Sequence, residues 1–107
     1  GETARYCIGV LREDAGRGGS RSAHEALHEG TALRIGAPKN HFPLVAARHS
    51  ILLAGGIGVT PLLAMAEALT AADASFAMHY CTRSRARTAF VDRIAAAPYA
   101  SRVAFHH

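Results

Sequence analysis

Residues 51–66, ILLAGGIGVTPLLAMA, limit the possible folds of this chain more than any other stretch. The first four are continuously apolar, as in a strand that is buried on both faces of a parallel sheet. The glycines that follow let the backbone turn tightly. Thr60 is a favourable N-cap, and Pro61 suits the first helical position. Apolar residues then recur at helical spacing, namely Leu62, Met65, Ala66 and Leu69. We therefore predict a strand, a glycine turn and a helix over residues 61–70.

The glycine turn has the composition of a phosphate-binding site. A helix N-terminus offers free N–H groups and a partial positive charge to a phosphate, and glycines leave room for it. The candidate residues for a pyrophosphate are Gly55, Gly56, Gly58, Thr60 and Pro61. The turn departs from the usual G-x-G-x-x-G, because Pro61 stands where the third glycine belongs. A turn that only lets strand and helix pack closely is the alternative.

The remaining elements of residues 47–107 continue the same alternation. Apolar patterns predict a strand over 76–81, a helix over 87–96 and a strand that begins over 102–105. This succession indicates a right-handed parallel α/β arrangement, for which we expect helices on both faces of the sheet. The basic sequence CTRSRAR follows the second strand, in place of the usual ribose-binding acid. Its hydroxyls and guanidiniums suit ribose or adenosine phosphates, and a solvated basic turn is the alternative.

The first part of the chain has a different pattern. It is predicted as a strand, a loop, a short helix and a second strand, over residues 5–12, 13–19, 20–29 and 31–36. Ser20 is the expected N-cap of the helix, and Gly30 is placed to end it. The run Arg17, Gly18, Gly19, Ser20 combines glycines, a hydroxyl and positive charge before a helix. It is a second candidate phosphate site, which suggests two cofactors, although a flexible loop explains it equally well.

Charge and apolar content narrow the class of protein. The formal net charge of +4 is consistent with an anionic partner such as a phosphate-bearing cofactor. Nucleic acid is not expected, since the basic residues are spread and not interleaved with aromatic ones. No apolar run approaches the ~18 residues of a membrane span, and the first residues do not resemble a signal peptide. We expect a cytoplasmic protein in which Cys7 and Cys81 are buried free thiols.

Residues 24–28, HEALH, match the H-E-x-x-H pattern of zinc proteases. His24 and His28 would share one helix face. The predicted helix is short, however, and no third ligand follows at the expected spacing. We therefore predict no metal site, and no residue of the chain stands out as an acid–base catalyst.

Several motifs occur in an order that resembles one family. The order resembles that of the phthalate dioxygenase reductase and vanillate demethylase reductase family, within the ferredoxin–NADP reductase-like superfamily. The motifs are, in order, GRGGS, APKNHFPL, ILLAGGIGVTP, HYCTR, TAF and VAFHH. The resemblance implies that residues 1–46 are the closing part of an antiparallel flavin-binding β-barrel. Residues 47–107 would be the first half of a Rossmann-like NAD(P)-binding domain. In this family NADH reduces FMN, which passes electrons to a plant-type [2Fe–2S] domain and then to a terminal oxygenase.

The resemblance also implies roles for individual residues. Ile8, Gly9 and Val10 would line the flavin, and Gly18, Gly19 and Ser20, beside Arg17, would hold the FMN phosphate. Gly56, Gly58 and Pro61 would shape the pyrophosphate turn. Thr60 would lie near the flavin ring, whereas Thr82 and Arg83 would face the adenosine half of NADH. FAD in place of FMN, and NADPH in place of NADH, stay open.

The chain lacks other parts of the family pattern. The upstream Arg-x-Tyr-Ser motif, the Cys-Gly-Pro segment and the four-cysteine motif are missing, and two cysteines cannot ligate a plant-type cluster. The sequence therefore resembles an excised piece of a longer reductase, with little activity alone and with dimerisation as an option. The alternative is a nucleotide- or flavin-binding module without a redox role.

Overall fold

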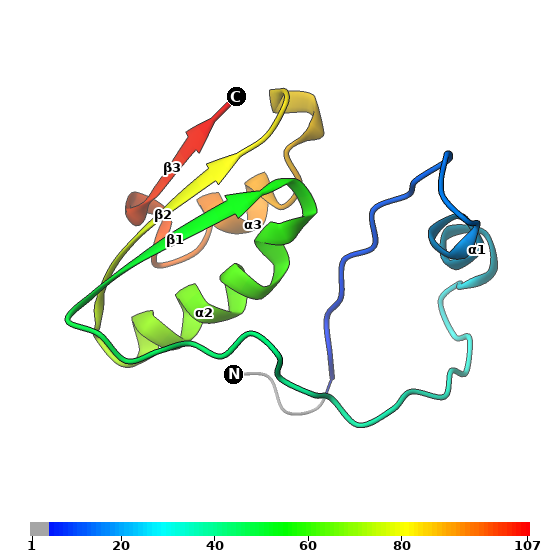
Figure 1. Ribbon diagram of the computed structural model, residues 1–107, viewed down its shortest axis with the longest axis horizontal. Helices are drawn as coiled ribbons and strands as arrows, with labels where there is room; N and C mark the ends of the chain where they lie inside the picture. Colours follow the sequence, from blue (N-terminus) through cyan, green and yellow to red (C-terminus); the bar gives the residue numbers. More distant parts are fainter. Residues whose placement is uncertain (1–4) are drawn as a thin grey trace. The chain divides into compact units, whose positions relative to one another are not determined.

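A three-stranded parallel sheet organises the second part of the chain. The computed structural model describes residues 5–107. Its strands are β1 (His49–Gly55), β2 (Ser75–Cys81) and β3 (Val103–His106), in the order β1-β2-β3. Helix α2 (Val59–Ala71) connects β1 to β2, and helix α3 (Val91–Ala95) lies between β2 and β3 (Figure 1). The parallel α/β class predicted from the apolar runs is confirmed.

The chain divides into two compact units. Residues 5–7 and 44–107 contain the sheet and are called the sheet unit, and residues 8–43 are called the loop unit. Short 3-10 turns connect the elements of the sheet unit, at Gly56–Gly58, Arg85–Arg87 and Ala100–Arg102. The loop unit contains helix α1 (Gly19–Ala26).

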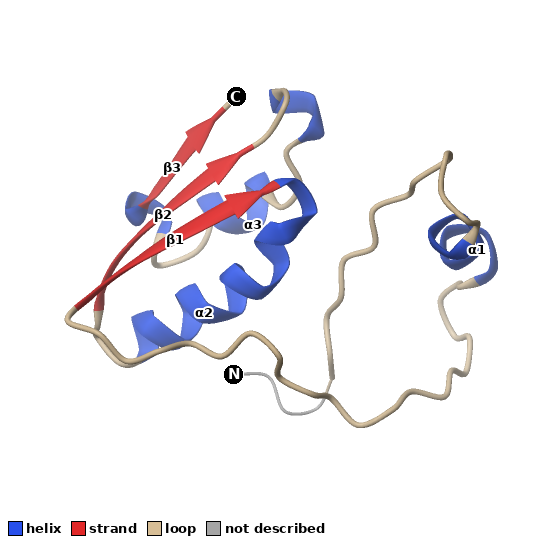
Figure 2. Cartoon of the chain, in the orientation of Figure 1, coloured by secondary structure: helices blue, strands red, loops and turns tan. Residues whose placement is uncertain are grey.

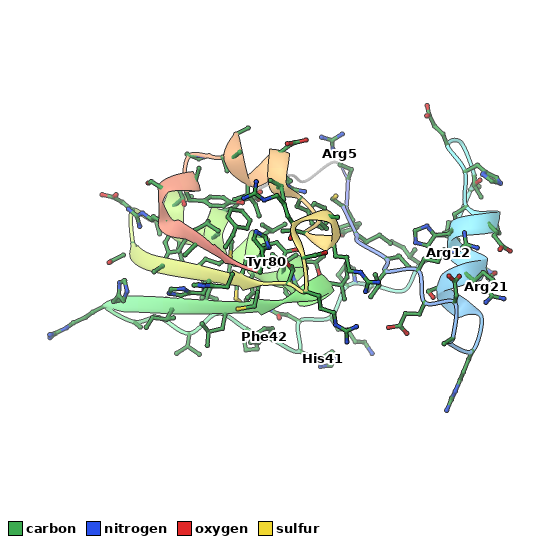
Figure 3. All side chains as sticks on the ribbon, turned by 90° about the horizontal axis from the view of Figure 1, so that it is seen from above. Arg5, Arg12, Arg21, His41, Phe42 and Tyr80 are labelled. Carbon is green, nitrogen blue, oxygen red and sulfur yellow. The ribbon has the colours of Figure 1, made fainter. Side chains whose placement is uncertain are left out.

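The hydrophobic core lies between α2, α3 and one face of the sheet. All four apolar residues predicted for the inner face of α2 are buried, together with Val59 and Leu63. Tyr80 of β2 and Ile94 of α3 belong to the same buried cluster, and Figure 3 shows Tyr80 inside the sheet unit. Burial raises the pKa of the Tyr80 hydroxyl, which donates a hydrogen bond to the Ala89 carbonyl.

The prediction of helices on both faces is wrong for this chain. Leu52 and Ala54 of β1 are buried, whereas Ile51 is 63% and Leu53 is 72% exposed. The strands are added in one direction, and crossovers between parallel strands are almost always right-handed. Successive crossovers of one hand place their helices on the same side, as Figure 2 shows for α2 and α3. The face that carries Ile51 and Leu53, called the outer face, therefore has no helix over it within the described residues.

The outer face also carries a stacked pair of histidines and Cys81. The rings of His79 and His106 are stacked with centroids 5.2 Å apart, and His79 Nδ1 lies 3.0 Å from His106 Nε2. Cys81 ends β2 and is exposed, and Cys7 is also an exposed free thiol. The expectation that both thiols are buried is therefore wrong. Their apolar sequence neighbours do not cover them, because Cys81 ends a strand and Cys7 lies outside any helix or strand.

The strands predicted over residues 5–12 and 31–36 do not form. Apart from α1, the loop unit has no helix or strand (Figure 2). Ile8 and Ile35 are exposed. A strand needs a hydrogen-bonded neighbour, and the described residues supply none for these two segments. The antiparallel barrel end is thus not seen in this structure.

Helix boundaries differ from the predicted ones where glycine or strained backbone intervenes. Helix α1 starts at Gly19 and ends at Ala26, so Ser20 lies inside it and Gly18, with φ 102°, is its N-cap. Helix α3 starts at residue 91 instead of 87, because Phe90 adopts a left-handed φ of 65°. Ile94 of α3 is buried, whereas Val91 at its start is exposed.

Candidate nucleotide site

The glycine turn and the basic segment after β2 lie at one edge of the sheet. Gly55, which ends β1, is in register with Cys81, which ends β2. The glycine turn and the basic segment therefore begin side by side, at the carboxyl ends of the neighbouring strands β1 and β2 (Figure 1). In open parallel α/β sheets, ligands bind outside this edge. The structure thus brings together two groups of predicted site residues that are far apart in the sequence.

The glycine turn, residues 55–58, is open. A Cβ atom built on Gly55, Gly56 or Gly58 would meet no atom within 4 Å outside its immediate neighbours. Gly56 has φ 52°, a left-handed conformation that glycine adopts without cost. Within residues 5–107, therefore, no side chain lies against the three glycines where a phosphate would approach them.

Thr60 is not the N-cap of α2, contrary to the prediction. The helix begins at Val59 through the 3-10 turn Gly56–Gly58, and Gly58 is the capping residue. The Thr60 hydroxyl donates to the Ile57 carbonyl at 3.3 Å, inside the turn. Pro61 lies in the first turn of α2, where a missing N–H costs little. Among the described residues no side chain makes a capping hydrogen bond to the start of α2.

Residues 82–88, called the basic loop, are held by hydroxyl groups. Thr82 Oγ1 lies 2.6 Å from Thr88 Oγ1, and both contact the Ser84 carbonyl, at 3.1 and 2.9 Å. Arg83, Arg85 and Arg87 are exposed, and no ion pair involves them in residues 5–107. Sequence reasoning singled out Thr82 and Arg83 but missed Thr88. Only the recurrence of a threonine six residues later could have suggested a contact between the two.

The second predicted phosphate site is a closed set of contacts in the loop unit. Ser20 Oγ accepts a hydrogen bond from the Glu13 backbone N–H at 2.9 Å, and the Arg21 guanidinium donates to the Asp14 carbonyl. Arg12 forms ion pairs with Asp14 at 3.1 Å and with Glu25 at 3.3 Å. Figure 3 shows Arg12 and Arg21 beside α1. Gly18 and Gly19 have open space at their Cα atoms, and Arg17 is exposed.

The predicted flavin-lining residues also lie in the loop unit. Ile8 and Val10 are exposed, and Gly9 is half-buried between them. The Val10 carbonyl lies 2.7 Å from Nε2 of His24, which connects this segment to α1. His24 is thus engaged with the backbone. No three His, Cys, Asp or Glu residues are grouped to hold a metal ion anywhere in residues 5–107.

None of the helices in the described part of the chain combines the length and apolar character needed to cross a membrane.

Three known proteins are similar to nearly the whole chain. Vanillate O-demethylase oxidoreductase of Pseudomonas putida is 57% identical over 106 residues, which cover 98% of this chain and 33% of the relative. Phthalate dioxygenase reductase of Burkholderia cepacia is 44% identical over 108 residues, 99% of this chain and 34% of the relative. The reductase subunit of tert-butanol monooxygenase from Aquincola tertiaricarbonis is 46% identical over 106 residues, 98% of this chain and 32% of the relative. No protein-family model matches the chain.

A solved structure agrees with these relatives. Phthalate dioxygenase reductase, described as a modular structure for electron transfer from pyridine nucleotides to [2Fe–2S], superposes with a TM-score of 0.86 at 44% identity. The match covers 92% of this chain and 31% of that chain. The chain thus spans about a third of the length of the relatives it matches. The resemblance indicated by the ordered motifs is confirmed: nearly the whole chain is similar in sequence to part of the vanillate demethylase and phthalate dioxygenase reductases.

Proposed function

We propose that this chain is part of the reductase component of an aromatic-ring oxygenase or demethylase. The whole polypeptide would carry electrons from NADH through FMN to a [2Fe–2S] centre, and a terminal oxygenase would receive them. Residues 47–107 would form the first half of the nucleotide domain, and residues 1–46 the end of the flavin barrel. The similarity to several reductase subunits over nearly the whole chain supports this assignment.

The open glycine turn at the carboxyl edge of the sheet is the observation that carries the proposal. Backbone amides can contact a diphosphate only where no side chain intervenes, and a Cβ at Gly55, Gly56 or Gly58 would project into free space. The basic loop lies beside it because Gly55 and Cys81 are in register. Its exposed guanidiniums, which form no ion pair within residues 5–107, supply positive charge for an anionic ligand.

The residues divide into two proposed sets. Gly55, Gly56, Gly58, Thr60 and Pro61 would form the pyrophosphate turn, and Thr82 with Arg83 would serve the adenosine half of NADH or NADPH. In the loop unit, Gly18 has a φ of 102° that favours glycine, and with Gly19 it leaves room for a phosphate near Arg17. The proposed FMN contacts are Ile8, Gly9, Val10, Arg17, Gly18, Gly19 and Ser20.

The chemistry comes from the bound groups, while the chain positions them. When bound, the nicotinamide supplies a hydride to the flavin, which releases electrons singly. The glycine turn would fix the diphosphate and so the reach of the nicotinamide. Cys7 and Cys81 are too few for a plant-type cluster, so the iron–sulfur ligands would come from another part of the polypeptide.

Replacing Gly58 with Ala in the whole reductase tests the proposal. Gly58 has φ −61°, which alanine adopts readily, and a Cβ there meets nothing within 4 Å beyond its chain neighbours in the described residues. The fold should therefore keep its stability, whereas a phosphate against the turn would meet the methyl. We expect the KM for NADH to rise about tenfold, equivalent to about 1.4 kcal/mol.

Gly36→Ala is the matched control. Gly36 also has open space at its Cα and lies outside the turn, so its substitution should leave the KM for NADH unchanged. An unchanged KM in the Gly58 variant would overturn the proposed site. A wild-type protein that binds NADH but never reduces a flavin would favour a binding module without a redox role.

A further inference from the structure

The basic loop is closed by a short chain of hydrogen bonds, called here the threonine clasp and made by Thr82, Thr88 and the Ser84 carbonyl. The Ser84 carbonyl oxygen lies near three donors, namely the Arg87 N–H at 3.1 Å and the two threonine hydroxyls. A carbonyl oxygen has two lone pairs. Three donors therefore share these two lone pairs, and the Thr82 and Thr88 hydroxyl oxygens, 2.6 Å apart, also hydrogen-bond to each other.

Both ends of the clasp are fixed by the backbone. The Thr82 N–H donates to the His106 carbonyl at 2.9 Å, which extends the pairing of β2 with β3 past Cys81. The Thr88 N–H donates to the Arg85 carbonyl at 3.2 Å and closes the 3-10 turn. His107 Nδ1 lies 3.1 Å from Thr82 Oγ1, so it adds a third side chain to the sheet end of the clasp.

The clasp works against the charge of the loop that it holds. Arg83, Arg85 and Arg87 place three like charges within five residues, and no carboxylate forms an ion pair with them in residues 5–107. Their mutual repulsion favours an open loop. Phe90, held at φ 65°, adds backbone strain just after the clasp. A loop that holds three exposed arginines close together against their repulsion has a geometry suited to binding an anion.

We infer that Thr82 and Thr88 are positioning residues, which shape the basic loop for the adenosine-side phosphate and ribose of the pyridine nucleotide. The Thr82 hydroxyl is consumed inside the protein, so contact with the nucleotide is left to the arginines and to the backbone of the loop. This inference rests on the proposed nucleotide site and reassigns Thr82 from ligand contact to positioning. It adds Thr88, which lies outside the residues predicted from the sequence.

Thr88→Val in the whole reductase tests the inference, because valine has the shape of threonine without the hydroxyl. We expect the KM for NADH to rise about tenfold, with less than a twofold change in kcat for ferricyanide reduction. Inhibition by ADP-ribose should weaken by the same factor, whereas inhibition by nicotinamide mononucleotide should not change. Thr88→Ser, which retains a hydroxyl, should restore wild-type values.

Thr70→Val is the matched control, since the Thr70 hydroxyl donates to the Ala66 carbonyl at 2.7 Å on α2, away from the loop. It should change neither constant. Should Thr88→Val fail to fold, Thr82→Val takes its place, because the Thr88–Ser84 hydrogen bond then remains. Unchanged ADP-ribose inhibition in the valine variant would overturn the clasp alone. A wild-type protein that binds neither ADP-ribose nor NADH would overturn the nucleotide site itself.

Discussion

Two buried tyrosines differ in a single hydrogen bond. Tyr80 donates its hydroxyl proton to the Ala89 carbonyl at 3.2 Å, whereas the Tyr99 hydroxyl is buried with no partner in the described residues. Burial raises the pKa of both phenols. Removal of a satisfied hydrogen bond costs about 1 kcal/mol, and removal of an unsatisfied buried hydroxyl is neutral or favourable.

Phenylalanine at each position should therefore have opposite effects. We expect Tyr80→Phe to lower the free energy of unfolding by about 1 kcal/mol and Tyr99→Phe to leave it unchanged or raise it. Urea unfolding of the two variants and the wild type measures the difference, and each variant is the control for the other. Equal losses at both positions would show that the Tyr99 hydroxyl has a partner that the structure does not reveal.

At the same scale, sequence reasoning predicted the wrong capping residues for α1 and α2. Ser20 and Thr60 were expected as helix caps, yet Gly18 and Gly58 are the caps. The Ser20 hydroxyl instead accepts from Glu13, seven residues earlier in the chain. A serine or threonine has a favourable local partner at a helix start. Which hydrogen-bond partner the hydroxyl has depends on how a neighbouring loop folds back, and the residues around the helix start do not predict that.

Among the helices and strands, those with a clear pattern of apolar residues were predicted well. Strands β1 and β2 and helix α2 agree with the predicted segments to within two residues at each end. Helix α3 is shorter than predicted, because the left-handed Phe90 interrupts the pattern. The strands predicted over residues 5–12 and 31–36 do not form. Alternation of apolar and polar residues indicates that a segment is able to pair as a strand, but it does not indicate that a partner strand is present.

Hydrogen exchange can test whether those two segments pair in the longer polypeptide. In the 107-residue chain, amides of residues 6–11 have no strand partner and should exchange within seconds to minutes. In the whole reductase, where we propose that they close a flavin barrel, their exchange should slow by at least about a hundredfold. The amides of Leu52 and Met78, in β1 and β2, serve as the reference that is protected in both. Rapid exchange of residues 6–11 in both proteins would contradict the barrel assignment.

For the whole molecule, the uncovered outer face is the feature that the succession of strands and helices did not reveal. A strand–helix–strand pattern gives the hand of each crossover but not the direction in which the next strand is added. Here both crossovers run the same way, so the helices cover one face and leave Ile51 and Leu53 exposed on the other. The relatives are about three times as long as this chain, and we expect the rest of such a polypeptide to cover that face.

The 107-residue chain alone should then associate with itself through the outer face, because contiguous exposed apolar side chains favour contact with another surface. Sedimentation velocity at increasing concentration should show dimers or larger species. Leu53→Lys places a charge on a side chain that is already 72% exposed, so it should abolish association without unfolding the chain.

Arg34→Lys, in the loop unit, is the control and should associate like the wild type. In the whole reductase the same Leu53→Lys change would bury a lysine, and we expect it to lower the free energy of unfolding by several kcal/mol. If the wild-type chain stays monomeric and the lysine does not change the free energy of unfolding of the whole reductase, nothing covers this face.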